Sequence, residues 1–83
     1  MQVTYSRVRK IGFVEVDGTT TAAISEWTWL ITGIGEPVAS VQITMKDSAK
    51  MQIAHDGLDL ARVIGSGIPS GTYIHCIGTY TIK

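Results

Sequence analysis

Alternation of apolar and polar positions is the dominant pattern along this chain. In the segment that starts at Ala23, odd positions hold Trp27, Trp29 and Ile31, whereas glutamate and threonine occupy even positions. Successive side chains of a strand point to opposite faces, so this period of two predicts a half-buried strand. We therefore expect both tryptophans and Ile31 to lie in the core or at a contact between subunits.

A second alternating segment places Val41, Ile43 and Met45 on one face and polar residues on the other. Both segments are rich in β-branched or aromatic residues, which suit a pleated surface. We expect these three side chains to belong to the core as well.

Residues 46–61 are open to two interpretations. A helix capped by Asp47 or Ser48 could end at Gly57, or a polar turn could lead into a strand that begins at Met51. We favour the second interpretation, a hairpin, because so short a helix needs tertiary contacts to be stable.

The last predicted strand ends the chain. Its inward positions are expected to be Ile74, Cys76, Tyr80 and Ile82. Gly78 marks a bulge or a close approach of another segment. The outward positions, Tyr73, His75 and Ile77, form a face that is unusually apolar for solvent. These three side chains are therefore the first candidates for a surface that meets a partner.

Turn signals separate the alternating segments. The strongest is the pair Asp17 and Gly18, because such a pair tolerates the positive φ angles of a tight hairpin. Glycine and proline recur over residues 33–37 and again over residues 65–71. Strands separated by turns at this spacing predict an all-β fold, a small antiparallel β-sandwich or barrel of about six or seven strands.

Composition adds an expectation about assembly. A chain of 83 residues is one domain, residues 1–83, and it buries only roughly 60 to 65% of its unfolded surface. Hydrophobic residues make up 45% and charged residues 17%, whereas soluble domains carry about 25% charge. Cys76 is the single cysteine, so no intrachain disulfide stabilises the fold. We therefore expect a homo-oligomer, in which another chain covers part of the apolar surface.

Charge argues against nucleic acid as the main partner, because seven basic and seven acidic residues cancel. The densest basic stretch lies in residues 1–10, which we expect to form an N-terminal arm or an edge strand. There Arg7 and Arg9 share one face of a strand and could dock an acidic partner or a phosphate. A solvated edge that carries protective charges is the favoured interpretation.

A membrane segment and a signal peptide are not expected. Residues 63–82 lack Lys, Arg, Asp and Glu over a membrane-spanning length, but four glycines and Pro69 would break a helix there. The basic residues near the N-terminus are followed by Glu15 and Asp17 rather than by an apolar run.

Candidate chemistry is sparse. His55 or His75 could join Cys76, Asp56 or Asp59 at a metal, but no close ligand pair with zinc spacing occurs. Adjacent strand residues point to opposite faces, which separates His75 from Cys76. We expect a turn at Asp56 rather than a calcium loop. The expectation is no enzymatic activity, no metal and no cofactor.

The stretch VASVQITMKDSAKMQIAHDG, residues 38–57, followed by IPSGTYIHCIGTYTI, resembles small bacteriophage virion proteins. Their pattern is a V-x-V-Q strand, a polar turn, a second strand, a D-G turn and a closing P-x-G-T-Y-I strand. The matching residues here are Val41, Gln42, Asp56, Gly57, Pro69, Gly71, Thr72, Tyr73 and Ile74.

The resemblance implies a β-sandwich or barrel module that decorates or cements capsids, or that occurs in head fibres and tails. The expected protein is a virion component made in the host cytoplasm. Its partners would be the major capsid protein or another virion protein, and copies of itself in a homo-oligomer such as a trimer. The alternative is a carbohydrate- or receptor-binding module of a tail or fibre, with Trp27, Trp29 or Tyr73 stacked on a sugar.

Overall fold

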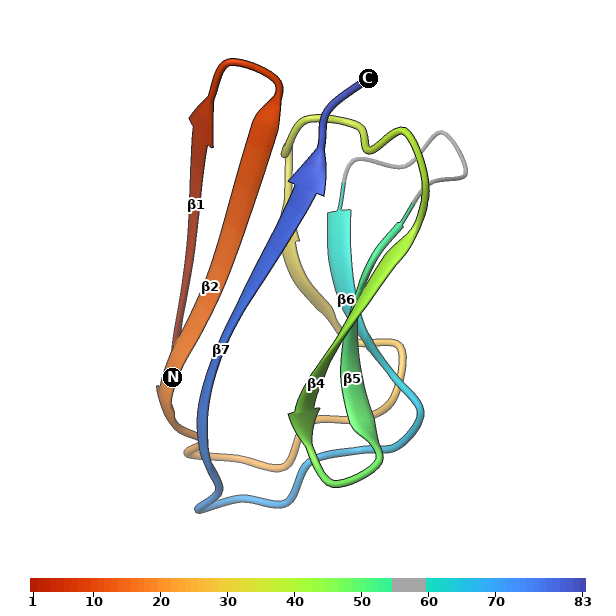
Figure 1. Cartoon of the computed structure of the whole chain (residues 1–83). Coiled ribbons are helices and arrows are strands. Elements are labelled where there is room, and N and C mark those ends of the chain that lie inside the picture. The colour runs from red at the N-terminus through yellow and green to blue at the C-terminus, as the bar shows by residue number, and fades with distance from the viewer. Residues whose placement is uncertain (55–59) are drawn as a thin grey trace.

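The computed structural model describes residues 1–54 and 60–83, and in these ranges it shows seven strands in two antiparallel sheets (Figure 1). The predicted all-β fold of a small antiparallel sandwich is confirmed. None of the described segments forms a helix long and apolar enough to cross a membrane. The strands are β1 Gln2–Val8, β2 Ile11–Thr19, β3 Trp29–Thr32, β4 Val41–Lys46, β5 Ala49–Ile53, β6 Leu60–Ile64 and β7 Tyr73–Thr81.

The first sheet has the order β1-β2-β7. Within residues 1–10, β1 is an edge strand of this sheet rather than an arm, and Arg9 turns the chain into β2 with a φ of 56°. The tight turn predicted at Asp17 and Gly18 is wrong, because both residues lie inside β2 and pair with β7. Gly18 is favoured there because its φ is 118°, which L side chains rarely adopt, and because a Cβ would lie 3.0 Å from the Cα of Met1.

The second sheet has the order β3-β6-β5-β4. Strands β4 and β5 form a hairpin, which confirms the favoured interpretation of the start of residues 46–61. Asp47 makes its turn with a φ of 52°, a conformation that aspartate tolerates better than most residues. The helix end at Gly57 and the turn at Asp56 fall outside the described residues.

The prediction that Trp27 and Trp29 lie in the core with Ile31 is wrong, whereas the alternative of a contact between subunits stays a prediction. Trp27 and Trp29 are 57% and 61% exposed. The pairing of β3 with β6 shifts between Trp29 and Ile31, which leaves Leu30 as an extra residue. A shift of one residue sends side chains to the opposite face. Ile31 therefore packs against the core while Trp29 faces outward.

Trp27 precedes β3 rather than belonging to it, so the strand begins later than Ala23. Its φ of 73° takes the backbone out of the extended conformation that the alternation assumed. The predicted shared face of the tryptophans and Ile31 thus fails at both tryptophans, for two separate backbone reasons.

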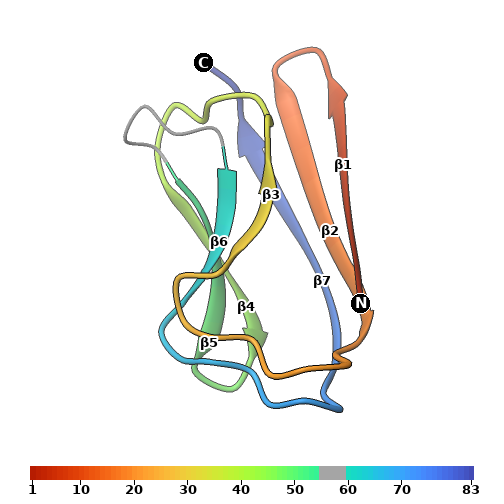
Figure 2. The ribbon, with the colours of Figure 1, turned by 180° about the vertical axis from the view of Figure 1, so that it is seen from behind.

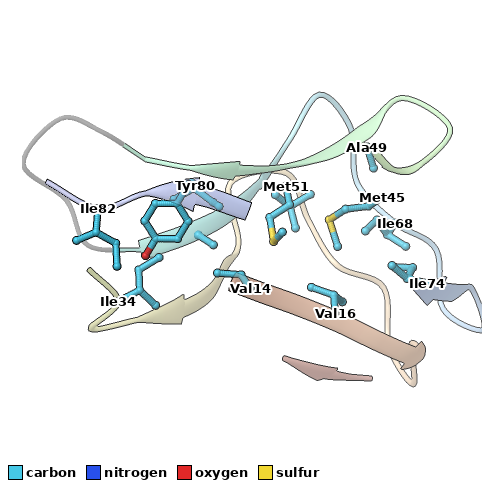
Figure 3. Packing of buried hydrophobic residues seen from close by; sticks show 13 residues of the cluster. Val14, Val16, Ile34, Met45, Ala49, Met51, Ile68, Ile74, Tyr80 and Ile82 are labelled. Atoms are coloured by element: carbon cyan, nitrogen blue, oxygen red, sulfur yellow. The ribbon is translucent and has the colours of Figure 1, made fainter. Parts of the chain in front are cut away.

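The core lies between the two sheets, where side chains from both inner faces interdigitate (Figure 3). The predicted core residues Met45, Ile74, Tyr80 and Ile82 are buried there. The others, Ile31, Val41, Ile43 and Cys76, are partly buried and pack against the same cluster.

Gly78 marks a close approach of the two sheets. A Cβ at this position would lie 2.7 Å from Cδ1 of Ile43 and 2.9 Å from Cε of Met51, both on the opposite sheet. The pairing of β7 with β2 runs through Gly78 without a shift, so the glycine serves the approach and forms no bulge.

Candidate docking surfaces

Two outer faces remain once the core is formed. The outer face of β3-β6-β5-β4 is called the tryptophan face here and is defined by Trp27, Trp29, Lys50, Gln52 and Arg62. The outer face of β1-β2-β7 is called the carboxylate face. Its defining residues are Glu15, Asp17, Tyr73, His75 and Ile77. Each face carries large apolar side chains that solvent reaches.

Strand pairing lines up the tryptophan face. Trp29 lies opposite Arg62, Arg62 opposite Gln52, and Gln52 opposite Gln42. The Nε of Arg62 donates a hydrogen bond to Oε1 of Gln52 at 2.8 Å. The same guanidinium lies 5.1 Å from the ring centroid of Trp27, within the range of a cation–π contact. Arg62 therefore lies beside both tryptophans, through the ring contact with Trp27 and the strand pairing with Trp29.

The backbone holds Trp27 in place. A positive φ is uncommon for a bulky residue and costs roughly 1–2 kcal/mol. The N–H of Trp27 donates to the carbonyl of Val63 at 2.6 Å, and the N–H of Val63 donates to the carbonyl of Thr28 at 2.9 Å. These bonds to β6, seen beside β3 in Figure 2, offset the strain. A strained residue with an exposed indole suits a functional position better than a structural one.

The described strand positions of the tryptophan face carry two cations and no carboxylate. Lys50 lies opposite both Thr44 and Ile64, one row along from Arg62. The other residues of these rows are neutral. A ligand or protein with carboxylates or other acidic groups is the natural complement of this face.

The carboxylate face has the opposite sign. Glu15 lies opposite Ile77, and Asp17 opposite His75. The Tyr73 hydroxyl donates to Oδ1 of Asp17 at 3.2 Å, and Nε2 of His75 lies 3.4 Å from Oε2 of Glu15. The hydrogen bond to Asp17 and its negative charge raise the pKa of Tyr73 above its usual value.

The five predicted interface residues do not form one surface. Tyr73, His75 and Ile77 are exposed on the carboxylate face, and solvent reaches 61% of Tyr73 and 52% of Ile77. Arg7 and Arg9 lie at the β1–β2 turn, where Nε of Arg7 donates to the carbonyl of Arg9 at 2.9 Å. Arg7 pairs with Gly12, near the end of β2 remote from Tyr73.

Cys76 and His75 are held apart as the alternation predicts. His75 is exposed, whereas Cys76 packs against the core. Burial raises the pKa of the Cys76 thiol, and a hydrogen bond from the Val16 backbone lowers it by less. Within residues 1–54 and 60–83, no three side chains of His, Cys, Asp or Glu come together as a metal site. His55, Asp56 and Asp59 lie outside the described residues.

The sequence alone did not identify the polar members of the tryptophan face or the carboxylates of the other face as surface candidates. Lys50, Gln52 and Arg62 are polar residues at alternate positions of two strands, which is a recognisable signal. Their meeting with Trp29 depends on the pairing of β6 with both β3 and β5, which no local pattern reveals.

The two faces together offer apolar area, aromatic rings and charges of opposite sign. These are the features that make noncovalent docking surfaces, in which tryptophan, tyrosine and arginine contribute most of the binding energy. No family model matches the chain, and no curated protein or solved structure matches it either.

Proposed function

We propose that the chain is a non-enzymatic structural protein of a virion, a capsid decoration or cement protein that oligomerises and stabilises the capsid lattice. The observation that carries the proposal is the exposure of large apolar side chains on both outer faces of one small sandwich. Large apolar side chains gathered on an exposed face are typical of surfaces that meet a partner.

A lattice suits a protein with two docking faces. Each contact must overcome the entropy lost on association, and many identical contacts held together do so jointly. Few charged residues are available to keep the faces solvated, since they make up only 17% of the chain. A particle surface would bury one face or both.

The segment that resembles phage virion proteins also supports a role in a virion. Its strands are β4, β5 and β7, and β4 packs beside β7 where the two sheets meet (Figure 1). The resembling residues thus come from both sheets and include Tyr73 of the carboxylate face. The resemblance is the reason for naming a virion rather than another large assembly.

Capsids of the phage that encodes the chain, stripped of decoration proteins, provide the test. Purified protein is expected to co-sediment with them at micromolar concentration and to raise their melting temperature. Trp29→Ala and Ile77→Ala should each weaken binding about tenfold or more, because each removes an exposed anchor. Thr79→Ala, a change at an exposed strand position without a large side chain, is the control. Absence of wild-type co-sedimentation would overturn the proposal.

The exposed tryptophans favour a second candidate, a carbohydrate- or receptor-binding module of a tail or fibre. Indole rings beside the planar groups of Arg62 and Gln52 can stack on a sugar ring and bond its hydroxyls. Titration with neutral and acidic oligosaccharides should shift tryptophan emission in the wild type. The shift should vanish in the double variant Trp27→Ala, Trp29→Ala. An unchanged wild-type spectrum with every oligosaccharide would exclude this candidate.

A further inference from the structure

The tryptophan face and the carboxylate face are complementary to each other. We propose that copies of this chain associate face to face, with the tryptophan face of one copy docked on the carboxylate face of the next. The inference builds on the proposed function only in its claim of oligomerisation. It adds which surfaces meet and in what symmetry.

Charge spacing agrees between the two faces. Glu15 and Asp17 are two residues apart on β2, which separates their Cα atoms by about 7 Å. Lys50 and Arg62 are diagonal neighbours on paired strands, and the backbone positions of such neighbours are also about 7–8 Å apart. Two carboxylates and two cations at one spacing can pair across a single interface.

Apolar side chains border these charges on both sides. On the tryptophan face the two indoles stand beside Arg62, through the stack with Trp27 and the strand pairing with Trp29. On the carboxylate face Ile77 lies opposite Glu15, and the Tyr73 hydroxyl reaches Asp17. Contact of the faces would bury aromatic and aliphatic area around the charge pairs, as in the centre of a protein interface.

The size of a face is adequate for specific association. The Cα extents of the molecule are 35 × 21 × 19 Å, so one broad face projects about 700 Å². A stable interface of standard size buries about 800 Å² on each partner. Docking over most of one face therefore falls near the lower end of specific complexes.

Symmetric pairing of identical faces is disfavoured. Two tryptophan faces would bring Lys50 and Arg62 against their own copies, and two carboxylate faces would do the same with Glu15 and Asp17. Like charges brought together at an interface cost several kcal/mol. Association is therefore heterologous, which produces an open stack, or a ring if the rotation closes. Because the two faces lie on opposite sides of the sandwich, a stack or a large ring fits better than a trimer.

Two charge-reversed variants test the proposal by sedimentation velocity over a concentration series at low salt. The first carries Glu15→Lys and Asp17→Lys, and the second carries Lys50→Glu and Arg62→Glu. All four positions lie on outer faces, so circular dichroism should show both variants folded. Wild type should sediment faster as its concentration rises, and added salt should reverse this. Each variant alone should associate about a hundredfold more weakly.

Mixing the two variants tests heterologous docking. The first variant keeps its tryptophan face and the second keeps its carboxylate face, so an equimolar mixture should recover complexes. Glu36→Lys, a charge reversal beside Lys83 and outside both faces, is the control and should associate like wild type. Wild type that stays monomeric, or variants that do not associate when mixed, would overturn the proposal.

A separate measurement of capsid binding distinguishes failure of this proposal from failure of the proposed function. Wild type that stays monomeric but binds stripped capsids would refute face-to-face association and leave the virion role intact. Wild type that associates as described but ignores capsids would refute the virion role and support the association.

Discussion

Trp29 and Ile31 point to opposite faces of one sheet, although they are separated by two positions in a single strand. Ile31 packs against the core, and Trp29 is 61% exposed beside Arg62. The extra residue Leu30 produces the reversal, because it also packs against the core and moves the strand by one place against β6. An exposed aromatic surface replaces what would otherwise be an aromatic core.

Removing an exposed tryptophan should cost little stability. We expect Trp29→Ala to change the free energy of unfolding by no more than about 0.5 kcal/mol, as for other surface substitutions. Ile53→Ala, at a fully buried position of β5, should cost about 2–5 kcal/mol. Urea denaturation followed by circular dichroism gives both values. A loss of several kcal/mol for Trp29→Ala would place the indole in the core after all.

Substitution of Gly78 should destabilise the sandwich. Gly78→Ala puts a methyl group against the side chains of Ile43 and Met51 on the opposite sheet. We expect a loss of about 1–3 kcal/mol, which is typical of overpacking. Thr79→Ala, at the next and exposed position, should stay near wild type. Equal denaturation midpoints for the two variants would contradict the close approach.

Alkaline pH should weaken the fold through Tyr80. Its hydroxyl donates to the carbonyl of Gly35 at 2.7 Å, and burial together with Tyr5 raises its pKa far above the usual value. Its folded pKa exceeds its unfolded one, so the contribution to stability is complete below about pH 10 and lost as pH rises further.

The variant Tyr80→Phe separates this effect from other alkaline transitions. At pH 7 it should lose about 1 kcal/mol, because the carbonyl of Gly35 loses its donor. Above pH 10 its melting temperature should fall less steeply than that of wild type. Parallel melting curves across the whole alkaline range would show that Tyr80 does not titrate on unfolding.

The Cys76 thiol should react slowly in the folded protein. Burial against the core raises its pKa and limits access, so little thiolate is available near neutral pH. Alkylation by iodoacetamide at pH 8 should be at least about tenfold slower than in the urea-unfolded chain. Equal rates, measured by mass spectrometry, would mean that Cys76 is exposed.

Local alternation predicted the orientation of β7 because its pairing with β2 is unbroken over the whole strand. For the same reason Ile74 and Tyr80 are buried while His75 and Ile77 are exposed. The hairpin of β4 and β5 was also predictable, since its polar turn at Asp47 is local.

The make-up of the two outer faces depends on contacts that are distant in sequence. Gly18 makes room for Met1, and Trp27 takes its conformation from hydrogen bonds to β6. Lys50 and Arg62 come together only because β5 pairs with β6, and His75 lies beside the carboxylates of β2 only because β7 pairs with β2. Periodicity within one segment carries no information about which distant strands will pair with it. The alternation around Trp29 therefore predicted a core position.

Collisional quenching of tryptophan emission tests the central claim most directly, because both tryptophans of the chain belong to the tryptophan face. In dilute solution, acrylamide should quench the folded protein nearly as well as the unfolded chain. If the tryptophan face docks on a second copy, the quenching constant should fall as protein concentration rises. It should stay high in the variant with Glu15→Lys and Asp17→Lys. A quenching constant that is low at every dilution, or independent of concentration, would contradict the account.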